Sequence, residues 1–309
     1  MLAPAGENPY KLSAVEVGTM RRTFLFMTCM MIMAASSARA QVSSPACNRE
    51  CLAGFVTKYL EALVAHKPEA LPVAPNTRFT EDCKEMKLGE GAWKSIEKLR
   101  DYRRDILDVR QGVAVSFVVA EENNSPVLYV VRLKVENNKI TEIESTAVRN
   151  QKEGMLFNPK NLETVSKTMT EFVPADKRAS REEAIKIALT YPAGLKVGSF
   201  VKVDSPMAQD AYRYENGQLM AGPGCTFFKG CDVMKTQAIP RLYGITHRVI
   251  AVDEELGVVA MRMNFGPGSL FQGDGELDVW HSFKIYDGQI HAAEAYCEIV
   301  PSRTKSGWE

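Results

Sequence analysis

Two stretches of this chain carry the same hairpin pattern although they lie far apart in the sequence. Residues 128–145 read LYVVRLKVENNKITEIES, and residues 280–295 read WHSFKIYDGQIHAAEA. Each stretch has a run of β-type residues, a two-residue turn and a second run that contains Ile-x-x-x-Glu, at 140–144 and at 290–294. A motif that recurs at this separation predicts two copies of one domain.

The first forty residues have the order of a secretory signal. Met20 begins a charged segment, residues 23–35 form an apolar stretch too short to span a bilayer, and residues 38–40 read Ala-Arg-Ala, a small-residue cleavage site. We expect translation to start at Met20 and cleavage to follow Ala40, which predicts a secreted protein, periplasmic or extracellular. The alternative is that the apolar stretch forms a buried helix.

The charge balance disfavours nucleic acid as a partner. The chain has 38 Lys and Arg and 38 Asp and Glu; residues 1–40 hold four of the basic and two of the acidic residues, which leaves 34 against 36. This near-neutral chain has no basic stripe to attract a polyanion. No apolar stretch after the signal is long enough to cross a membrane, and the length suits two domains.

The cysteine count agrees with export. Six cysteines remain after the signal: Cys47, Cys51, Cys83, Cys225, Cys231 and Cys297. An even number in an oxidising compartment predicts disulfides, although six cysteines allow fifteen pairings. Cys225 and Cys231 bracket a glycine-containing loop and are the first expected pair, and Cys47 and Cys51 can pair if both precede the first helix. The alternative of half a metal site lacks completing ligands, so we expect no metal and no cofactor.

The order of expected elements repeats along the chain. Helical periodicity over residues 48–66 is followed by a short hairpin, a short helix and a long meander that ends at residue 148. Ser180 and Glu183 then form a capping box that opens a second helix, followed by strands up to residue 299. We predict modules at 41–150 and 179–309, a connector at 151–178, and upstream residues with the signal at 1–40.

This order, with its closing "FKIYDGQI..AEA", resembles the nuclear transport factor 2-like superfamily, to which SnoaL-like and ketosteroid-isomerase-like proteins belong. Residues 59–93, YLEALVAHKPEALPVAPNTRFTED…LGEGAW, resemble the first half of secreted proteins that carry two such modules. The resemblance implies an α+β fold of two tandem cone-shaped modules, each a curved antiparallel sheet wrapped by N-terminal helices. It also implies contact through the backs of the sheets, as an internal pseudo-dimer or as a homodimer.

The resemblance also implies a function. Such a cone holds a small apolar organic molecule, and the superfamily carries out isomerase, dehydratase, lyase or cyclase reactions without a redox cofactor. The rival interpretation is a non-catalytic module that binds a ligand or another protein.

The closing hairpin suggests an acid–base pair. If Asp287-Gly288 is a two-residue turn, counting outward places His281 opposite Glu294, on the apolar face of Phe283. A carboxylate that orients an imidazole suits general acid–base catalysis. The alternatives are a structural ion pair, or a bulge that changes the register.

The same count in the first hairpin places Glu142 opposite Leu133 and Glu144 opposite Val131, with Arg132 on the other face and no histidine. The second module is therefore the better catalytic candidate.

A second cluster surrounds Glu81, which we expect near Trp93 and Tyr102 in a pocket suited to moving protons. Its counterpart in the second module is Glu215. The alternative is a turn of solvated charges. The predicted catalytic residues are thus His281, Glu294 and Glu215. The predicted ligand-binding residues are Glu81, Trp93, Tyr102, Arg132, Arg213 and Tyr296.

Overall fold

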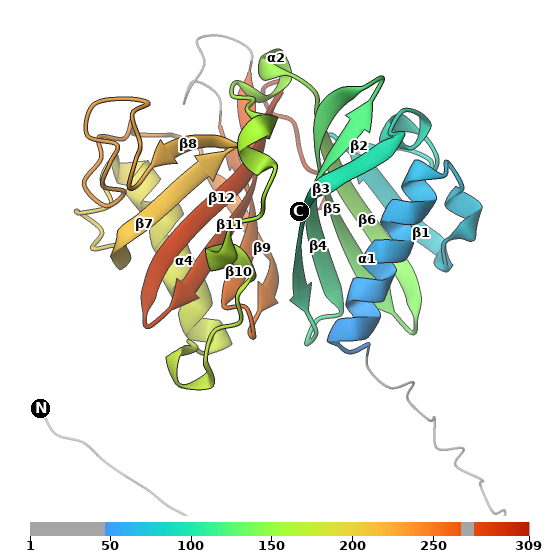
Figure 1. Cartoon of the computed structure of the whole chain (residues 1–309), viewed down its shortest axis with the longest axis horizontal. Coiled ribbons are helices and arrows are strands. Elements are labelled where there is room, and N and C mark those ends of the chain that lie inside the picture. Colours follow the sequence, from blue (N-terminus) through green and yellow to red (C-terminus); the bar gives the residue numbers. More distant parts are fainter. Residues whose placement is uncertain (1–46, 267–274, 309) are drawn as a thin grey trace, which may run out of the picture. The chain divides into compact units, whose positions relative to one another are not determined.

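The computed structural model describes residues 47–266 and 275–308, and the predicted signal at 1–40, with Met20 and Ala40, lies outside the described residues. The described chain forms two six-stranded sheets with the same strand order, β2-β1-β6-β5-β4-β3 and β8-β7-β12-β11-β10-β9 (Figure 1). This confirms the predicted α+β class and the two tandem modules. The domain boundaries themselves stay a prediction.

The first module opens with a helix and a short hairpin. Its elements are α1 (Arg49–Val64), η1 (Pro68–Ala70), β1 (Val73–Glu81), β2 (Lys84–Glu85), η2 (Gly91–Lys94), β3 (Lys98–Asp108), β4 (Val113–Glu122), β5 (Ser125–Glu136) and β6 (Lys139–Val148). Asn48 begins α1, because its side chain accepts a hydrogen bond from the Cys51 amide. The apolar stripe of α1 packs on one face of the sheet and closes the first core.

The connector and the second module follow. The connector holds α2 (Gln151–Gly154), η3 (Pro159–Leu162), α3 (Lys167–Thr170) and η4 (Ala175–Lys177). The second module has α4 (Arg181–Val197), β7 (Met207–Glu215), β8 (Gln218–Ala221), β9 (Thr246–Asp253), β10 (Val258–Phe265), β11 (Glu276–Tyr286) and β12 (Gln289–Val300). Ser180 caps α4 through the Glu183 amide, as the capping box predicts, and Gly198 ends the helix in a left-handed conformation.

Each sheet is mixed, whereas the sequence predicted an antiparallel one. Strand β1 runs parallel to β6, and β7 runs parallel to β12, while the remaining neighbours are antiparallel. Parallel neighbours cannot be joined by a tight hairpin, and in each module the other four strands connect the first strand to the last.

Both closing hairpins contain a β-bulge at the same place. The β5–β6 register shifts between Lys134 and Val135, and the β11–β12 register shifts between Lys284 and Ile285. A bulge sets two residues of one strand against one of the other, which moves every later pair by one position. The predicted registers therefore hold for the two pairs next to each turn and are wrong beyond the bulge.

Beyond the bulge, Glu294 pairs with Ser282, and His281 pairs with Ala295. In the first hairpin Arg132 pairs with Glu144, and Glu142 pairs with Lys134. Because side chains alternate along a strand, His281 and Glu294 point to opposite faces of their sheet.

The backs of the two sheets share one buried apolar cluster. It contains Ile106, Val115 and Phe117 from the first sheet together with Trp280 and Tyr296 from the second. The rings of Phe117 and Tyr296 meet edge to face with centroids 5.2 Å apart.

Two buried aspartates join the modules reciprocally. Asp108, at the end of β3, accepts hydrogen bonds from Arg181 at 3.1 and 2.6 Å and from the Val252 amide at 2.9 Å. Asp253, at the end of β9, accepts from Arg49 at 2.7 and 2.9 Å, and the Leu107 amide donates to it at 2.9 Å. Each arginine is the first residue of its helix. We call the four side chains Asp108, Arg181, Asp253 and Arg49 the aspartate clasp.

Within the described chain there are two disulfides, Cys47–Cys51 and Cys225–Cys231, and two free cysteines, Cys83 and Cys297. Cys51 lies in the first turn of α1, so its pairing does not require that both cysteines precede the helix. None of the helices in the described ranges combines the length and the apolar composition of a membrane span.

Candidate functional site

The interior of the second module contains a cavity of about 260 Å³. Its walls are mainly apolar and include Leu195 of α4, Leu277 of β11, Met220 of β8, and Phe228 and Ile239 from the loop between β8 and β9. Three polar side chains also line it: Tyr191, Arg213 and Glu215. An apolar cavity with a few convergent polar groups is typical of a small-molecule site.

The polar end of the cavity is organised around Arg213. Its guanidinium donates to the Tyr191 hydroxyl at 3.1 Å and to Gln237 Oε1 at 3.3 Å, and its Nε lies 3.3 Å from Glu215 Oε1. Burial raises the pKa of Tyr191 to about 12, so the phenol is protonated at neutral pH. The site therefore offers a hydroxyl donor and a carboxylate beside a neutralising guanidinium.

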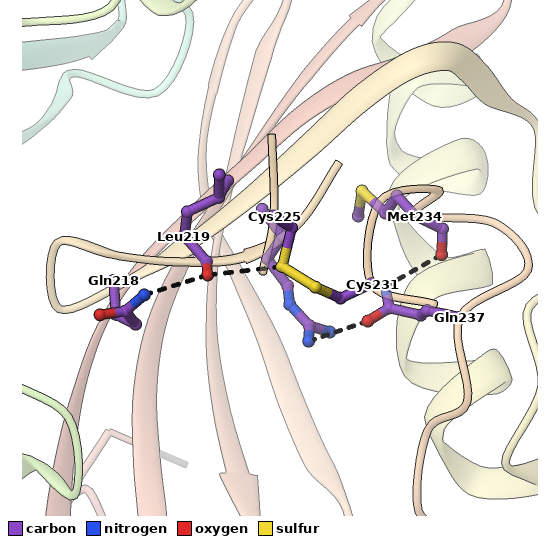
Figure 2. The surroundings of a disulfide bond; sticks show 7 residues. Gln218, Leu219, Cys225, Cys231, Met234 and Gln237 are labelled. Atoms are coloured by element: carbon purple, nitrogen blue, oxygen red, sulfur yellow. Dashed lines mark hydrogen bonds between the residues drawn. A yellow bond between two sulfur atoms is a disulfide. The ribbon is translucent and has the colours of Figure 1, made fainter. Parts of the chain in front are cut away.

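The loop between β8 and β9 is fastened where it walls the cavity. The Cys225–Cys231 disulfide lies beside Leu219, with the Cys225 sulfur 3.7 Å from the Leu219 carbonyl oxygen, and Gln237 donates to the Met234 carbonyl at 2.9 Å (Figure 2). Gln237 thereby holds the guanidinium of Arg213 from the loop side. The disulfide and this amide fix the loop against the polar end of the site.

The corresponding interior of the first module is filled by aromatic side chains. Tyr59 lies as far into α1 as Tyr191 does into α4, and its hydroxyl is 2.8 Å from that of Tyr129. Trp93 Nε1 donates to the same Tyr59 oxygen at 3.2 Å. The equivalent position in the second module holds Val279. Tyr129 of β5 pairs with Ala147 of β6, and Val279 of β11 pairs with Cys297 at the same place in the β11–β12 hairpin. The smaller side chain agrees with a more open interior in the second module.

Glu81 lies inside the first module beside Trp93, at the position that Glu215 occupies in the second. Glu81 is 2 % exposed and accepts hydrogen bonds from the Ala92 amide at 2.7 Å and from the Ser145 hydroxyl at 3.2 Å. Burial, helped by repulsion from Asp82, raises the pKa of Glu81 to about 7. Glu81 is therefore not part of a solvated turn.

We expect Glu81→Gln to change how stability depends on pH. The folded pKa of Glu81 lies above the ordinary value of 4.5, so the folded protein holds a proton that the unfolded chain releases. Stability therefore falls as pH rises from about 4.5 to about 7, by up to about 3 kcal/mol. Denaturant unfolding of both proteins across this range measures the effect. As pH rises, the free energy of unfolding of the variant should increase relative to that of the unchanged protein. A constant difference would contradict the shifted pKa.

The predicted pairing of His281 with Glu294 is wrong, because the bulge places the two side chains on opposite faces. His281 is 1 % exposed and packs in the core of the second module, with its ring 4.9 Å from Phe283 and 5.0 Å from Tyr191. Burial, with a contribution from Arg213, lowers the pKa of His281 to about 3, so its ring is neutral. Its Nδ1 has no hydrogen-bond partner within the described chain.

Glu294 lies on the back of the sheet, where the first module meets it. Its carboxylate accepts from Tyr212 at 3.1 Å and from Tyr102 at 3.4 Å, and Arg104 Nε lies 3.3 Å away. Tyr102 thus belongs to the buried cluster between the two sheets, and not to the core of the first module that contains Trp93, where the sequence placed it. Tyr296 points to the same interface and donates to the Val118 carbonyl at 3.2 Å.

Arg132 forms an ion pair with Glu142 at 2.7 Å, on the same face of the first sheet, so its predicted separation from the two glutamates is wrong. Of the predicted residues, the structure brings Arg213 to Glu215 and brings Tyr102 to Glu294. Sequence reasoning missed Tyr191. The sequence did contain an indication of it, because Tyr59 in α1 and Tyr191 in α4 lie at the same distance from the first residue of their helices.

Comparisons with known proteins add little about function. A family model described as a domain of unknown function (DUF8021) matches residues 177–297, from η4 to β12. A solved structure of an NTF2-like protein of unknown function from Cytophaga hutchinsonii is 12% identical, covers 33% of this chain and 91% of its own, and gives a TM-score of 0.23. The structure of AusH from Aspergillus nidulans is 15% identical, covers 38% of this chain and 85% of its own, and gives a TM-score of 0.26. No curated protein matches the chain.

Proposed function

We propose that the second module binds a small, mostly apolar organic molecule that carries a carbonyl or hydroxyl oxygen. The observation that carries this proposal is the apolar cavity of about 260 Å³ that ends on Tyr191, Arg213 and Glu215. Burial of apolar ligand surface favours binding, and the few polar groups orient the ligand. The disulfides are compatible with an oxidising compartment, and secretion belongs to this proposal.

The polar end also supports a cofactor-independent proton transfer, which we propose as the reaction. The Tyr191 oxygen accepts from Arg213, and its own proton can be donated to a ligand carbonyl. Glu215 can take a proton from the carbon next to that carbonyl, while the electron pair moves onto the oxygen that Tyr191 stabilises. Return of the proton to another carbon completes an isomerisation, and loss of a leaving group completes a lyase reaction.

Carvone, an apolar cyclic enone, is a suitable probe for residues 41–309. We expect binding by calorimetry, and we expect Met220→Trp to abolish it because the larger ring fills the cavity. Tyr191→Phe should weaken binding about tenfold, which corresponds to about 1.4 kcal/mol for one hydrogen bond. Met86→Trp, a half-buried methionine of the first module, is the matched control and should leave binding unchanged. If Met220→Trp binds carvone normally, the cavity is not the site.

The proton transfer has a separate readout. In D2O, NMR should show deuterium entering carvone next to its carbonyl, and Glu215→Gln should stop this exchange while binding persists. Binding without exchange in the unchanged protein would leave a non-catalytic binding module and reject the reaction.

A further inference from the structure

A second, larger pocket of about 490 Å³ lies outside the interior of either module. It is lined by Tyr102 of β3, by the connector around η3 and α3, and by the outward face of β7 and β12. Along β7, Tyr212 and Tyr214 face this pocket, whereas Arg213 and Glu215 between and beyond them face the cavity. One strand thus supplies alternate side chains to two different sites.

The carboxylate of Glu294, which is 6 % exposed, lines this pocket. It accepts from the hydroxyls of Tyr212 and Tyr102, and the Tyr212 oxygen lies 2.7 Å from Ser166 Oγ on the connector. The rings of Tyr212 and Tyr214 meet edge to face at 5.6 Å. Residues from both modules and the connector therefore build one polar network.

Neutral groups that can both donate and accept dominate the lining. They are the hydroxyls of Tyr102, Tyr212, Tyr214, Thr164 and Ser166 and the amide of Asn161. The charged lining residues are Glu294 and the exposed Asp210. Such a surface matches a ligand that itself carries several hydroxyl groups.

The pair of Arg104 and Glu294 narrows the ligand class further. Arg104 is 2 % exposed, its Nε lies 3.3 Å from Glu294, and its Nη1 has no hydrogen-bond partner among the described residues. Arg104 is not among the residues that line the pocket, and its ion pair with Glu294 offsets the charge of the carboxylate. A ligand hydroxyl can donate to this carboxylate without bringing a charge of its own, which favours a neutral ligand.

We propose that this pocket binds a neutral polyhydroxylated molecule, of the size of one or two sugar rings, at a site distinct from the cavity of the second module. The pocket lies within the range of about 300–1,000 Å³ that small-molecule sites occupy. The proposal does not depend on the function proposed for the cavity.

The test is saturation-transfer NMR and calorimetry on residues 41–309. The probes are glucose, galactose, N-acetylglucosamine, maltose and cellobiose, with choline as a cation and acetate as an anion for comparison. We expect at least one saccharide to bind at millimolar concentrations. Tyr214→Ala and Tyr212→Phe should each weaken binding about tenfold or more, because each removes a lining hydroxyl. Tyr286→Phe is the control and should leave binding unchanged.

Tyr214 is half-buried, so Tyr214→Ala is the variant that should fold without difficulty. An unchanged thermal midpoint together with weakened saccharide binding supports the proposal. It is overturned if none of the five saccharides binds, if choline or acetate binds there instead, or if saccharide binding is unaffected by Tyr214→Ala and Tyr212→Phe. Unchanged carvone binding in the Tyr214→Ala variant would show that the two sites are separate.

Discussion

Replacing Asp253 with alanine lowers the free energy of unfolding by about 3–5 kcal/mol, the range found when one partner of a buried ion pair is removed. The side chain of Asp253 is fully buried, and it receives two hydrogen bonds from Arg49 and one from the Leu107 amide. Its loss strands a guanidinium and a buried backbone donor at the contact between the modules. Urea titration of residues 41–309 at neutral pH measures the loss.

The matched control is Glu255→Ala. Glu255 also approaches Arg49, at 4.0 Å, but its side chain is 49% exposed, so we expect a change within about 0.5 kcal/mol. The reciprocal change Asp108→Ala should resemble Asp253→Ala, since Asp108 has the same set of partners from the other module. A loss below about 1 kcal/mol for both aspartates would mean that the aspartate clasp does not stabilise the fold.

The second large effect is expected for Asn216→Ala, with a loss of about 4 kcal/mol. The buried amide of Asn216 donates to the carbonyls of Gly154, Leu156 and Cys297 at 3.1, 2.8 and 2.9 Å, and its Oδ1 accepts from the Cys297 amide at 2.8 Å. Alanine leaves these groups unsatisfied and must also adopt a positive φ, here 47°. Thermal and urea unfolding measure the loss.

Asn138→Ala separates the two causes. Asn138 also has a positive φ, 58°, but it is exposed at the tip of the β5–β6 hairpin. Its replacement therefore reports the backbone strain alone, about 1 kcal/mol. If Asn216→Ala is no more destabilising than Asn138→Ala, then the side-chain hydrogen bonds of Asn216 contribute nothing measurable.

The tandem fold was predictable because its signals are local. Strand alternation, turn residues and the capping box at Ser180 each depend on a few neighbouring residues, and their repetition exposes the two copies. The correspondence between Glu81 and Glu215 was predictable for the same reason, since both end the first strand of their module.

The candidate site was harder to predict because it depends on register and on contacts distant in sequence. The turn at Asp287 was correctly identified, yet the bulge next to it was not, and one added residue moved His281 away from Glu294. Tyr102 meets Glu294 across 192 positions of the chain, a contact that no local pattern encodes. Arg213 was recognised, whereas Tyr191 was missed although both helices have a tyrosine at the same position, because only the packing of α4 on the sheet brings its hydroxyl to Arg213.

The two modules differ in how their interiors are packed: aromatic side chains fill the first, and the second contains a cavity. A hollow core gives up dispersion contacts, so a single module that acquires a cavity approaches its stability limit. Here the copy that contains Tyr129 and Trp93 has an interior filled by aromatic side chains, and it is joined to the other copy through the aspartate clasp. The stability of the first module can therefore compensate for destabilising substitutions in the second. The side chains of the cavity can then change, and the second module can acquire new ligands, without unfolding the chain.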